Sequence, residues 1–244
     1  MAQAMAPPAE LAELAPMCPA DAKKVFLIRH GNSTYNAWRD ETVRTCTCLC
    51  ATWRDHDAPL SVKGREQVQA LRKEVMARGL HQQVQLVVCS PLTRAIDTAL
   101  GGFWDVHGKD SSDGPVAGRP PVLALSLVAE RLDTACDIGR PASELRSAYR
   151  DVDFGQVAEF WWYGGEDNCP APGFPHDREP VDCCRTRVEE ALQWLRQRPE
   201  TCIAVVGHSA FFQLMTGSWR KMPNCGISEL TLAPESEGES PSAG

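Results

Sequence analysis

Short apolar runs alternate with longer amphipathic segments along most of this chain, which is the pattern of an α/β fold. The runs at 25–28, 86–89 and 203–206 are apolar at every position, as expected for strands that are buried on both faces of a parallel sheet. A further apolar run covers 123–127, and 227–232 is expected to form a final strand.

Amphipathic helices are expected between these strands. The clearest is 64–79, whose buried face is formed by residues at helical spacing, namely Val68, Leu71, Val75 and Met76. Ser90 suits the cap, and Pro91 the start, of a helix that runs to about Leu100. Other helices are expected at 141–150, 181–198 and 210–218.

This alternation predicts one domain over 23–232, a three-layer α/β/α sandwich with a mostly parallel central sheet. The Ala- and Pro-rich segment 1–22 is expected to be a flexible tail, and the Ser-, Glu- and Pro-rich segment 233–244 a disordered one. An insert at 37–59 could cover a pocket. The aromatic cluster 161–163 could line either the core or a substrate wall, and its composition favours the core.

Composition argues against several classes of partner. The chain has 244 residues and a formal net charge of −7, so its surface as a whole does not attract nucleic acid or an anionic membrane. No run approaches the roughly 18 apolar residues of a membrane-spanning helix. We therefore expect neither nucleic-acid nor membrane partners, and any anion-binding pocket must be a local feature.

The 11 cysteines favour free thiols in a reducing compartment. Their odd count does not resemble a secreted disulfide framework, and the start of the chain lacks the features of a secretory signal, so we expect a cytoplasmic protein. Cys46, Cys48 and Cys50, with His56 nearby, allow a metal site, but the second ligand pair typical of structural zinc is missing. A solvated or partly packed loop is the favoured interpretation, and no metal is expected.

Basic side chains follow the predicted strands at their carboxyl ends. Arg29 and His30 end the first strand, Arg94 lies in the helical turn after the second, and His208 follows the third. A fourth apolar run leads to a carboxylate, Glu130. The carboxyl ends of parallel strands meet at one edge, where helix N-termini add partial positive charge. A polar turn at the end of a strand would explain Arg29 and His30 taken alone. The four strand ends taken together predict a pocket for a dianionic phosphate.

Phosphoryl transfer needs positioning and charge neutralisation, which such a pocket supplies. Each of two guanidinium groups can bind two oxygens of one phosphate. A neutral imidazole can attack phosphorus in line, and the leaving alkoxide then needs a proton from a carboxylic acid with a raised pKa. Neither a metal ion nor an organic cofactor is required for this chemistry.

Four segments, in this order, resemble the motifs of the histidine phosphatase superfamily, the phosphoglycerate-mutase-like proteins. RHGNSTYN at 29–36 resembles the RHG signature, and LSVKGREQ at 60–67 resembles the step into the first long helix. SPLTRA at 90–95 and GHS at 207–209 resemble the second arginine and second histidine motifs. The likeness runs from about 24 to 232.

The resemblance implies a role for each matching residue. His30 would be the nucleophile that becomes phosphohistidine, and Glu130 the acid and base. The phosphoryl oxygens would be bound by Arg29, Arg94, His208 and Asn36, with His208 also counted as catalytic. Gly31 is expected to let the backbone approach the phosphate. A salt bridge is the structural alternative for Glu130, with Arg131 or Arg94 as its partner and Asp137 then the next candidate acid.

Two departures from the family pattern favour a phosphatase over a mutase. Asn32 stands where an acidic residue is frequent, and the Arg- and Tyr-rich stretch of the mutase subgroup has no counterpart. We expect hydrolysis of a small phosphorylated substrate rather than a phosphoprotein, with a phosphoglycerate-type mutase or a phospho-ligand-binding pseudoenzyme as the alternatives. Arg131, Arg140 and Lys221 are candidates for binding further substrate charge, although solvated helix ends would explain them equally well.

Overall fold

A computed structural model describes residues 22–45, 53–104, 118–168 and 177–234. The central sheet has six strands in the order β4-β3-β2-β5-β1-β6. Their bounds are β1 Lys23–Arg29, β2 Leu86–Cys89, β3 Val122–Ala124, β4 Val152–Asp153, β5 Cys202–Gly207 and β6 Ile227–Leu232. All neighbouring pairs are parallel except β1 and β6, so the predicted mostly parallel sheet is confirmed.

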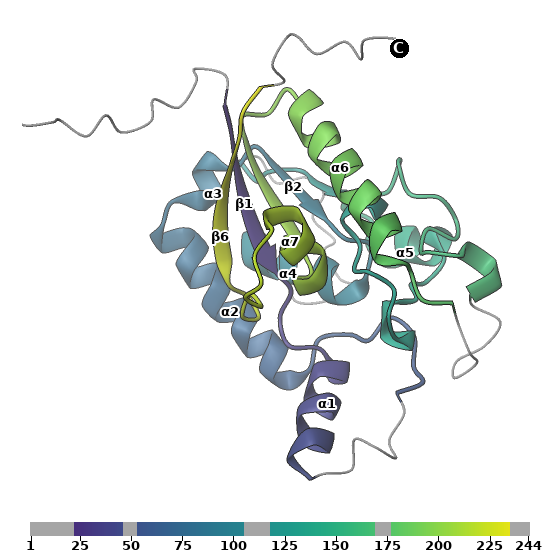
Figure 1. Cartoon of the computed structure of the whole chain (residues 1–244). Helices are drawn as coiled ribbons and strands as arrows, with labels where there is room; N and C mark the ends of the chain where they lie inside the picture. Colours follow the sequence, from purple (N-terminus) through teal and green to yellow (C-terminus); the bar gives the residue numbers. More distant parts are fainter. Residues whose placement is uncertain (1–21, 46–52, 105–117, 169–176, 235–244) are drawn as a thin grey trace, which may run out of the picture.

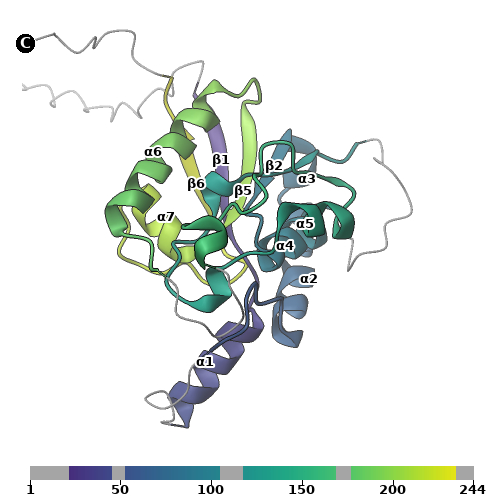
Figure 2. The ribbon, with the colours of Figure 1, turned by 90° about the vertical axis from the view of Figure 1, so that its right-hand side faces the viewer.

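The described helices cover both faces of the sheet, and this completes the three layers (Figure 1). Their bounds are α1 Thr34–Arg44, α2 Val62–Ala77, α3 Leu80–Gln83, α4 Thr93–Phe103, α5 Ala142–Ala148, α6 Val181–Gln197 and α7 Ser209–Thr216. Viewed from the side, α6 and α7 lie on one face of the sheet and α2, α4 and α5 on the other (Figure 2). No helix in the described ranges is long and apolar enough to cross a membrane.

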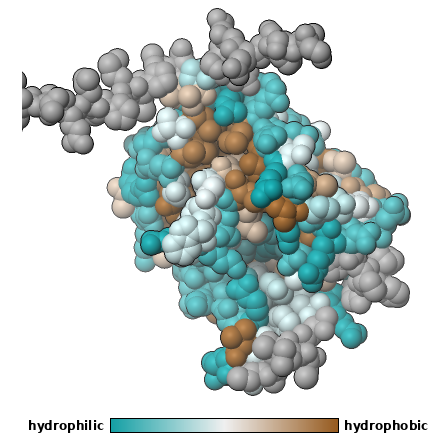
Figure 3. All heavy atoms as spheres, viewed as in Figure 1, coloured by the Kyte–Doolittle hydropathy of each residue, from teal (hydrophilic) through white to brown (hydrophobic). Residues whose placement is uncertain are grey.

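Alternate residues of the buried strands belong to two separate cores. Phe26 and Ile28 of β1 pack toward α2 and α4, whereas Val25 and Leu27 pack toward α6 and α7. Burial on both faces explains why these strands are continuously apolar rather than alternating. On the face of Figure 1, the remaining apolar surface gathers between β6 and α6, surrounded by hydrophilic side chains (Figure 3).

The strand register brings three strand ends to one edge of the sheet. Arg29 at the end of β1 pairs with Gly207 at the end of β5, and Cys89 at the end of β2 pairs with Val206. Because α1, α4 and α7 each begin just after one of these ends, their N-termini lie along the same edge. The geometry expected of an anion-binding edge is therefore present.

The structure corrects several local predictions. β3 ends at Ala124, and the apolar run continues as a 3₁₀ turn at Ser126–Val128, while β4 was not predicted. Residues 37–44 of the predicted insert are helical and project from the body as part of α1 (Figure 1). The segment 46–52, with its three cysteines, lies outside the described residues, as do most of both predicted tails.

The predicted cap of α4 is also wrong. The helix begins at Thr93, after Leu92, and its first N–H donates to the carboxylate of Asp57 at 2.7 Å. The same carboxylate accepts from the Thr93 hydroxyl and from Arg140. A side chain from a distant loop thus satisfies the helix start, and a search for local caps could not find it.

Candidate active site

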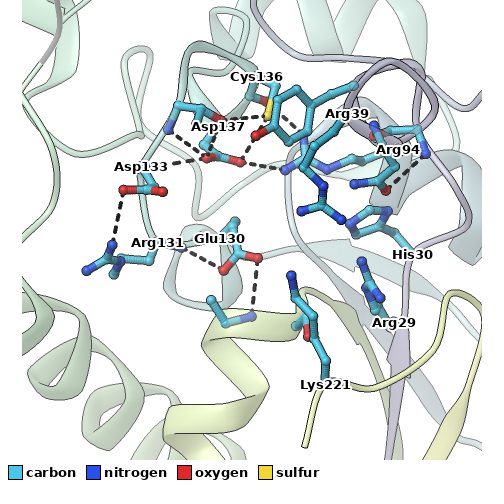
Figure 4. A pocket seen from close by; sticks show the side chains of 16 residues that line it. Arg29, His30, Arg39, Arg94, Glu130, Arg131, Asp133, Cys136, Asp137 and Lys221 are labelled. Carbon is cyan, nitrogen blue, oxygen red and sulfur yellow. Dashed lines mark hydrogen bonds and ion pairs between the residues drawn. The ribbon is translucent and has the colours of Figure 1, made fainter. Parts of the chain in front are cut away.

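A cavity of about 160 Å³ lies at the carboxyl edge of the sheet (Figure 4). Five of the six residues predicted for the site line it: Arg29, His30, Asn36, Arg94 and Glu130. The sixth, His208, lies against His30, with 5.0 Å between the ring centroids. The tertiary structure therefore brings together residues that are almost 180 positions apart in the sequence.

The imidazole of His30 is fixed in one orientation. Its Nδ1 lies 2.6 Å from the carbonyl oxygen of Gly31, and its backbone is held by Gly207 and by the side chain of Asn224. Because a carbonyl can only accept, Nδ1 carries the proton and Nε2 keeps its lone pair. Burial lowers the pKa of His30 well below its usual value, and Arg94 and Arg29 lower it further. The group is therefore neutral near pH 7.

The loop that holds His30 is anchored to the start of α2. Asn32 accepts a hydrogen bond from Ser61 at 2.7 Å, and Ser61 also caps α2 by accepting from the N–H of Gly64. A Cβ on Gly64 would lie 2.0 Å from the carbonyl oxygen of Asn32, so only glycine allows this approach. Gly31 was expected to let the backbone approach the phosphate, and this is wrong in detail. A Cβ added to Gly31 would point at Gly64 rather than into the cavity.

His208 is fully buried at the end of β5, as the residue before α7. Neither of its ring nitrogens has a hydrogen-bond partner among the described residues. Burial lowers its pKa well below the usual value, and the nearby Arg94 adds to the effect. A buried polar group without a partner is costly, and His208 is not among the residues that line the cavity.

The two predicted arginines are held by different anchors. Arg94 donates from Nη1 to the carbonyl of Cys136 at 2.7 Å and from Nη2 to Asp137 at 2.9 Å. Arg29 donates from Nη1 to the carbonyl of Met222 at 2.6 Å, while its buried Nε has no partner among the described residues. Each guanidinium is fixed on one side and can meet an anion with its remaining donors.

Glu130 occupies the wall across the cavity from His30 (Figure 4). Its carboxylate accepts from the backbone N–H groups of Arg131, Ala210 and Phe211 at 2.9, 3.3 and 3.1 Å. Burial raises its pKa, Asp137 raises it further, and the N–H groups partly oppose this. The salt-bridge alternative is wrong, because Arg131 pairs with Asp133 and Arg94 with Asp137.

Asn36 serves the start of α1. Its side-chain oxygen accepts from the N–H of Ser33 at 3.2 Å, and Ser33 in return accepts from the N–H of Asn36 at 3.1 Å. This reciprocal cap leaves only the amide NH₂ of Asn36 to donate to a ligand in the cavity.

Of the additional charge candidates, Arg131 and Lys221 line the cavity, whereas Arg140 is tied to Asp57 and Thr93. Sequence reasoning missed Arg39, which projects from α1 into the cavity (Figure 4). Its spacing of three from Asn36 would have revealed it once the helix was recognised. Burial lowers the pKa of Lys221, and Arg39 and Arg29 add to this, so these cations share one positive field.

The described residues contain no cluster of three or more His, Cys, Asp or Glu side chains suited to a metal ion. Cys46, Cys48 and Cys50 lie outside them. Cys89 is free and buried next to the site, and burial raises the pKa of its thiol, so this side chain is suited to packing rather than to chemistry.

Comparison with known proteins identifies the family. Residues 25–102 match the model of the histidine phosphatase superfamily (branch 1). A phosphoglycerate mutase-like protein of Arabidopsis thaliana is 30% identical over 217 residues, which cover 82% of this chain and 75% of that protein. The chain belongs to the histidine phosphatase superfamily. Phosphoglycerate mutase-like protein 1 of the same plant is 30% identical over 209 residues, covering 78% of this chain and 69% of that relative.

Solved structures of histidine phosphatase fold agree with this assignment. The ecdysone phosphate phosphatase of Bombix mori, in complex with tungstate, has a TM-score of 0.52 and 17% identity. That match covers 91% of this chain and 96% of the other. Mycobacterial hydrolase 1 has a TM-score of 0.50 and 17% identity, covering 86% of this chain and 91% of the other. At this identity the likeness establishes the fold.

Proposed function

We propose that this histidine phosphatase superfamily member hydrolyses a small phosphate monoester through a phosphohistidine on His30, without a metal ion. The observation that carries the proposal is the state of His30. The imidazole is neutral, its Nδ1 is fixed on the Gly31 carbonyl, and its ring lies among buried cations. A fixed tautomer with a free Nε2 is what in-line attack on phosphorus needs.

In the first step, the lone pair of His30 Nε2 attacks phosphorus and the bond from phosphorus to the ester oxygen breaks. The bonding electrons go to that oxygen, which takes a proton from Glu130 on the opposite wall. Arg29, Arg94 and His208 stabilise the charge that spreads over the three equatorial oxygens. Their fixed anchors mean that little reorganisation is needed during the reaction.

In the second step, Glu130 acts as the base. Its carboxylate takes a proton from water, the water oxygen attacks phosphorus, and the P–N bond breaks. The electron pair returns to Nε2 of His30, and inorganic phosphate leaves. Glu130 is then protonated again and the cycle is complete.

The cations of the cavity support metal independence. Among the described residues, five cationic side chains line it, namely Arg29, Arg39, Arg94, Arg131 and Lys221, against three acidic ones, Glu130, Asp133 and Asp137. A net positive cavity can neutralise a phosphate dianion in the way that metal ions do in other phosphoryl-transfer enzymes. The size of the cavity supports a small substrate over a phosphoprotein.

A phosphomutase is the second candidate, because the similar plant proteins carry mutase-like names. Both activities would use the same phosphohistidine. A mutase must return the phosphoryl group to a second hydroxyl instead of water. A pseudoenzyme is less well supported, because every motif residue proposed for catalysis is present.

One assay series separates the three. The protein is incubated with phosphorylated metabolites, nucleotides and phosphopeptides, and the products are followed by phosphate detection and by ³¹P NMR. Release of inorganic phosphate is expected. Positional isomerisation without release would make the protein a mutase, and saturable binding without either reaction would make it a binding protein.

A further inference from the structure

A second cavity, of about 130 Å³, adjoins the first. The residues common to both are Glu130 and Asp137. Its other lining residues are Ser126, Ala129, Leu132, Trp161, Trp162, Tyr163, Glu179 and Arg187. The sequence favoured the core for the aromatic cluster 161–163, and Trp162 does pack with Leu132 and Ile138, but all three residues of the cluster also line this cavity.

Trp162, one of the residues that line this second cavity, carries a hydrogen-bond donor without a partner among the described residues. The side chain of Trp162 is only 5% exposed, and its indole Nε1 has no partner among the described residues. The neighbouring Trp161 differs, because its Nε1 donates to the carbonyl of Arg140 at 3.0 Å. A buried N–H without an acceptor costs free energy, so an acceptor on a ligand would be favoured there.

The charge of the second cavity is opposite to that of the first. Among the described residues, its one cationic side chain is Arg187, which is bound to Glu179 through two hydrogen bonds of 3.0 and 2.7 Å and also donates to backbone carbonyls. The carboxyl groups of Glu130 and Asp137 complete the lining. A carboxylate or a second phosphate would meet no unpaired cation among the described residues of this lining.

The position of Glu130 relates this cavity to the reaction, and this step rests on the proposed function. In-line attack by His30 places the ester oxygen on the opposite side of phosphorus, next to Glu130. Glu130 faces His30 across the first cavity (Figure 4) and also lines the second. The carbon skeleton beyond the ester oxygen would therefore extend toward the second cavity.

We infer that the second cavity binds the alcohol portion of the substrate, and that this portion is a planar, largely apolar group without negative charge that offers an acceptor to Trp162. The size agrees, since a cavity of roughly 150 Å³ holds a benzene ring. Aromatic walls favour such a ring through offset or edge-to-face contacts.

The test uses phosphonates, which bind the phosphoryl site but cannot be hydrolysed. Their affinities for the full chain are measured by calorimetry, with propyl, 3-phenylpropyl, 3-(pyridin-4-yl)propyl and 3-carboxypropyl phosphonate as probes. We expect the phenyl compound to bind at least tenfold more tightly than the propyl compound, the pyridyl compound a further three- to tenfold more tightly, and the carboxylate most weakly.

Two variants locate the preference. Trp162→Phe keeps an aromatic ring but removes the N–H, so the pyridyl and phenyl compounds should become equal. Tyr163→Ala removes a partly exposed wall and should reduce the preference for phenyl over propyl. Trp219→Phe, at a residue that is 81% exposed and lines neither cavity, is the matched control and should keep the wild-type ranking.

The inference is overturned by equal affinity for the propyl and phenyl compounds or by tightest binding of the carboxylate. It is also overturned if Trp162→Phe lowers the affinity for all four phosphonates by the same factor. A wild-type ranking as expected, in a protein that releases no phosphate from any ester, would support the second cavity while rejecting the proposed hydrolysis. If no phosphonate binds while phosphate is released from esters, the second cavity loses its role and the proposed hydrolysis stands.

Discussion

Arg94 and Asp137 form a buried ion pair on the wall of the candidate active site, with 2.9 Å between Nη2 and Oδ1. Both side chains are less than one-tenth exposed. Asp137 is itself held through Oδ2, which accepts from the N–H groups of Asp133 and Thr134 at 3.3 and 3.1 Å. The pair thus positions one of the two guanidinium groups that are proposed to bind phosphate.

Asp137→Asn should impair catalysis without removing any proposed catalytic group. The amide keeps the size of the side chain but loses its charge, so Arg94 remains buried without a counter-ion and shifts. We expect kcat/KM to fall roughly 10–10²-fold, as for other misplacements of a positioning group. Asp182→Asn, which breaks an exposed pair on α6, is the control and should change kcat/KM less than about threefold. An unchanged kcat/KM in Asp137→Asn would show that Arg94 needs no such support.

His30→Ala should abolish turnover and leave the fold intact. Rapid quenching of the wild type with a ³²P-labelled substrate should trap a phosphoprotein that is labile in acid and stable in base, and the variant should form none. Thermal unfolding serves as the check on the fold. If the variant keeps a tenth of the wild-type kcat, the covalent mechanism is wrong.

Glu130→Gln should separate substrates by their leaving groups. An alkyl phosphate leaves as a strongly basic alkoxide and needs the proton, so its kcat/KM should fall roughly 10²–10⁴-fold. p-Nitrophenyl phosphate leaves as a stabilised phenolate and should lose far less. Equal losses of kcat/KM on both substrates would mean that Glu130 contributes to the structure of the site, by accepting from backbone N–H groups, and does not act as the acid.

The same carboxyl should shape the pH profile. Because burial and Asp137 raise the pKa of Glu130, the acid form persists above the usual range and is lost as the pH rises through that raised pKa. The kcat/KM of an alkyl phosphate should therefore decline on the basic side, and Glu130→Gln should flatten this limb. A limb that persists unchanged in the variant would assign it to another group.

Stability should fall on acidification because of His30 and His208. The pKa of each is well below its value in the unfolded chain, so the unfolded chain binds more protons. The stabilisation is present above the unfolded value of about 6.5 and is lost as the pH falls toward the folded pKa, by up to about 1.4 kcal/mol per pH unit for each group. His208→Asn should lessen the fall in Tm between pH 7.5 and 5.5, and a fall of unchanged size would assign the acid sensitivity to other groups.

Removal of metal ions should leave the activity unchanged. Chelation followed by desalting is expected to preserve kcat within error, because the cations of the cavity neutralise the phosphate. Vanadate, which adopts the five-coordinate geometry of the transition state, should inhibit. Activity that returns only with added Mg²⁺ or Zn²⁺ would contradict metal independence and would make Cys46, Cys48 and Cys50 candidate metal ligands.

Local patterns in the sequence were enough for most of the strands, for most of the helices and for the order of the motifs. The run 25–28 and the residues that follow it predict a buried strand that ends in Arg29 and His30, because burial on both faces and a strand-to-helix turn are encoded within a few positions. The convergence of His30 with Arg94 and His208 follows from the parallel topology, which the alternation of elements also predicts.

The fine structure of the site depends on contacts between residues far apart in the chain, and only the tertiary structure decides these. Arg94 meets Asp137 43 positions later, and Glu130 accepts from Ala210 80 positions later. No local propensity distinguishes an acid that pairs with Arg94 from one that remains free to carry a proton, because the difference lies in burial and in which donors surround each carboxyl. The strand ends and the motifs placed most of the reacting groups at the edge of the sheet, whereas packing set their partners and the direction of their pKa shifts.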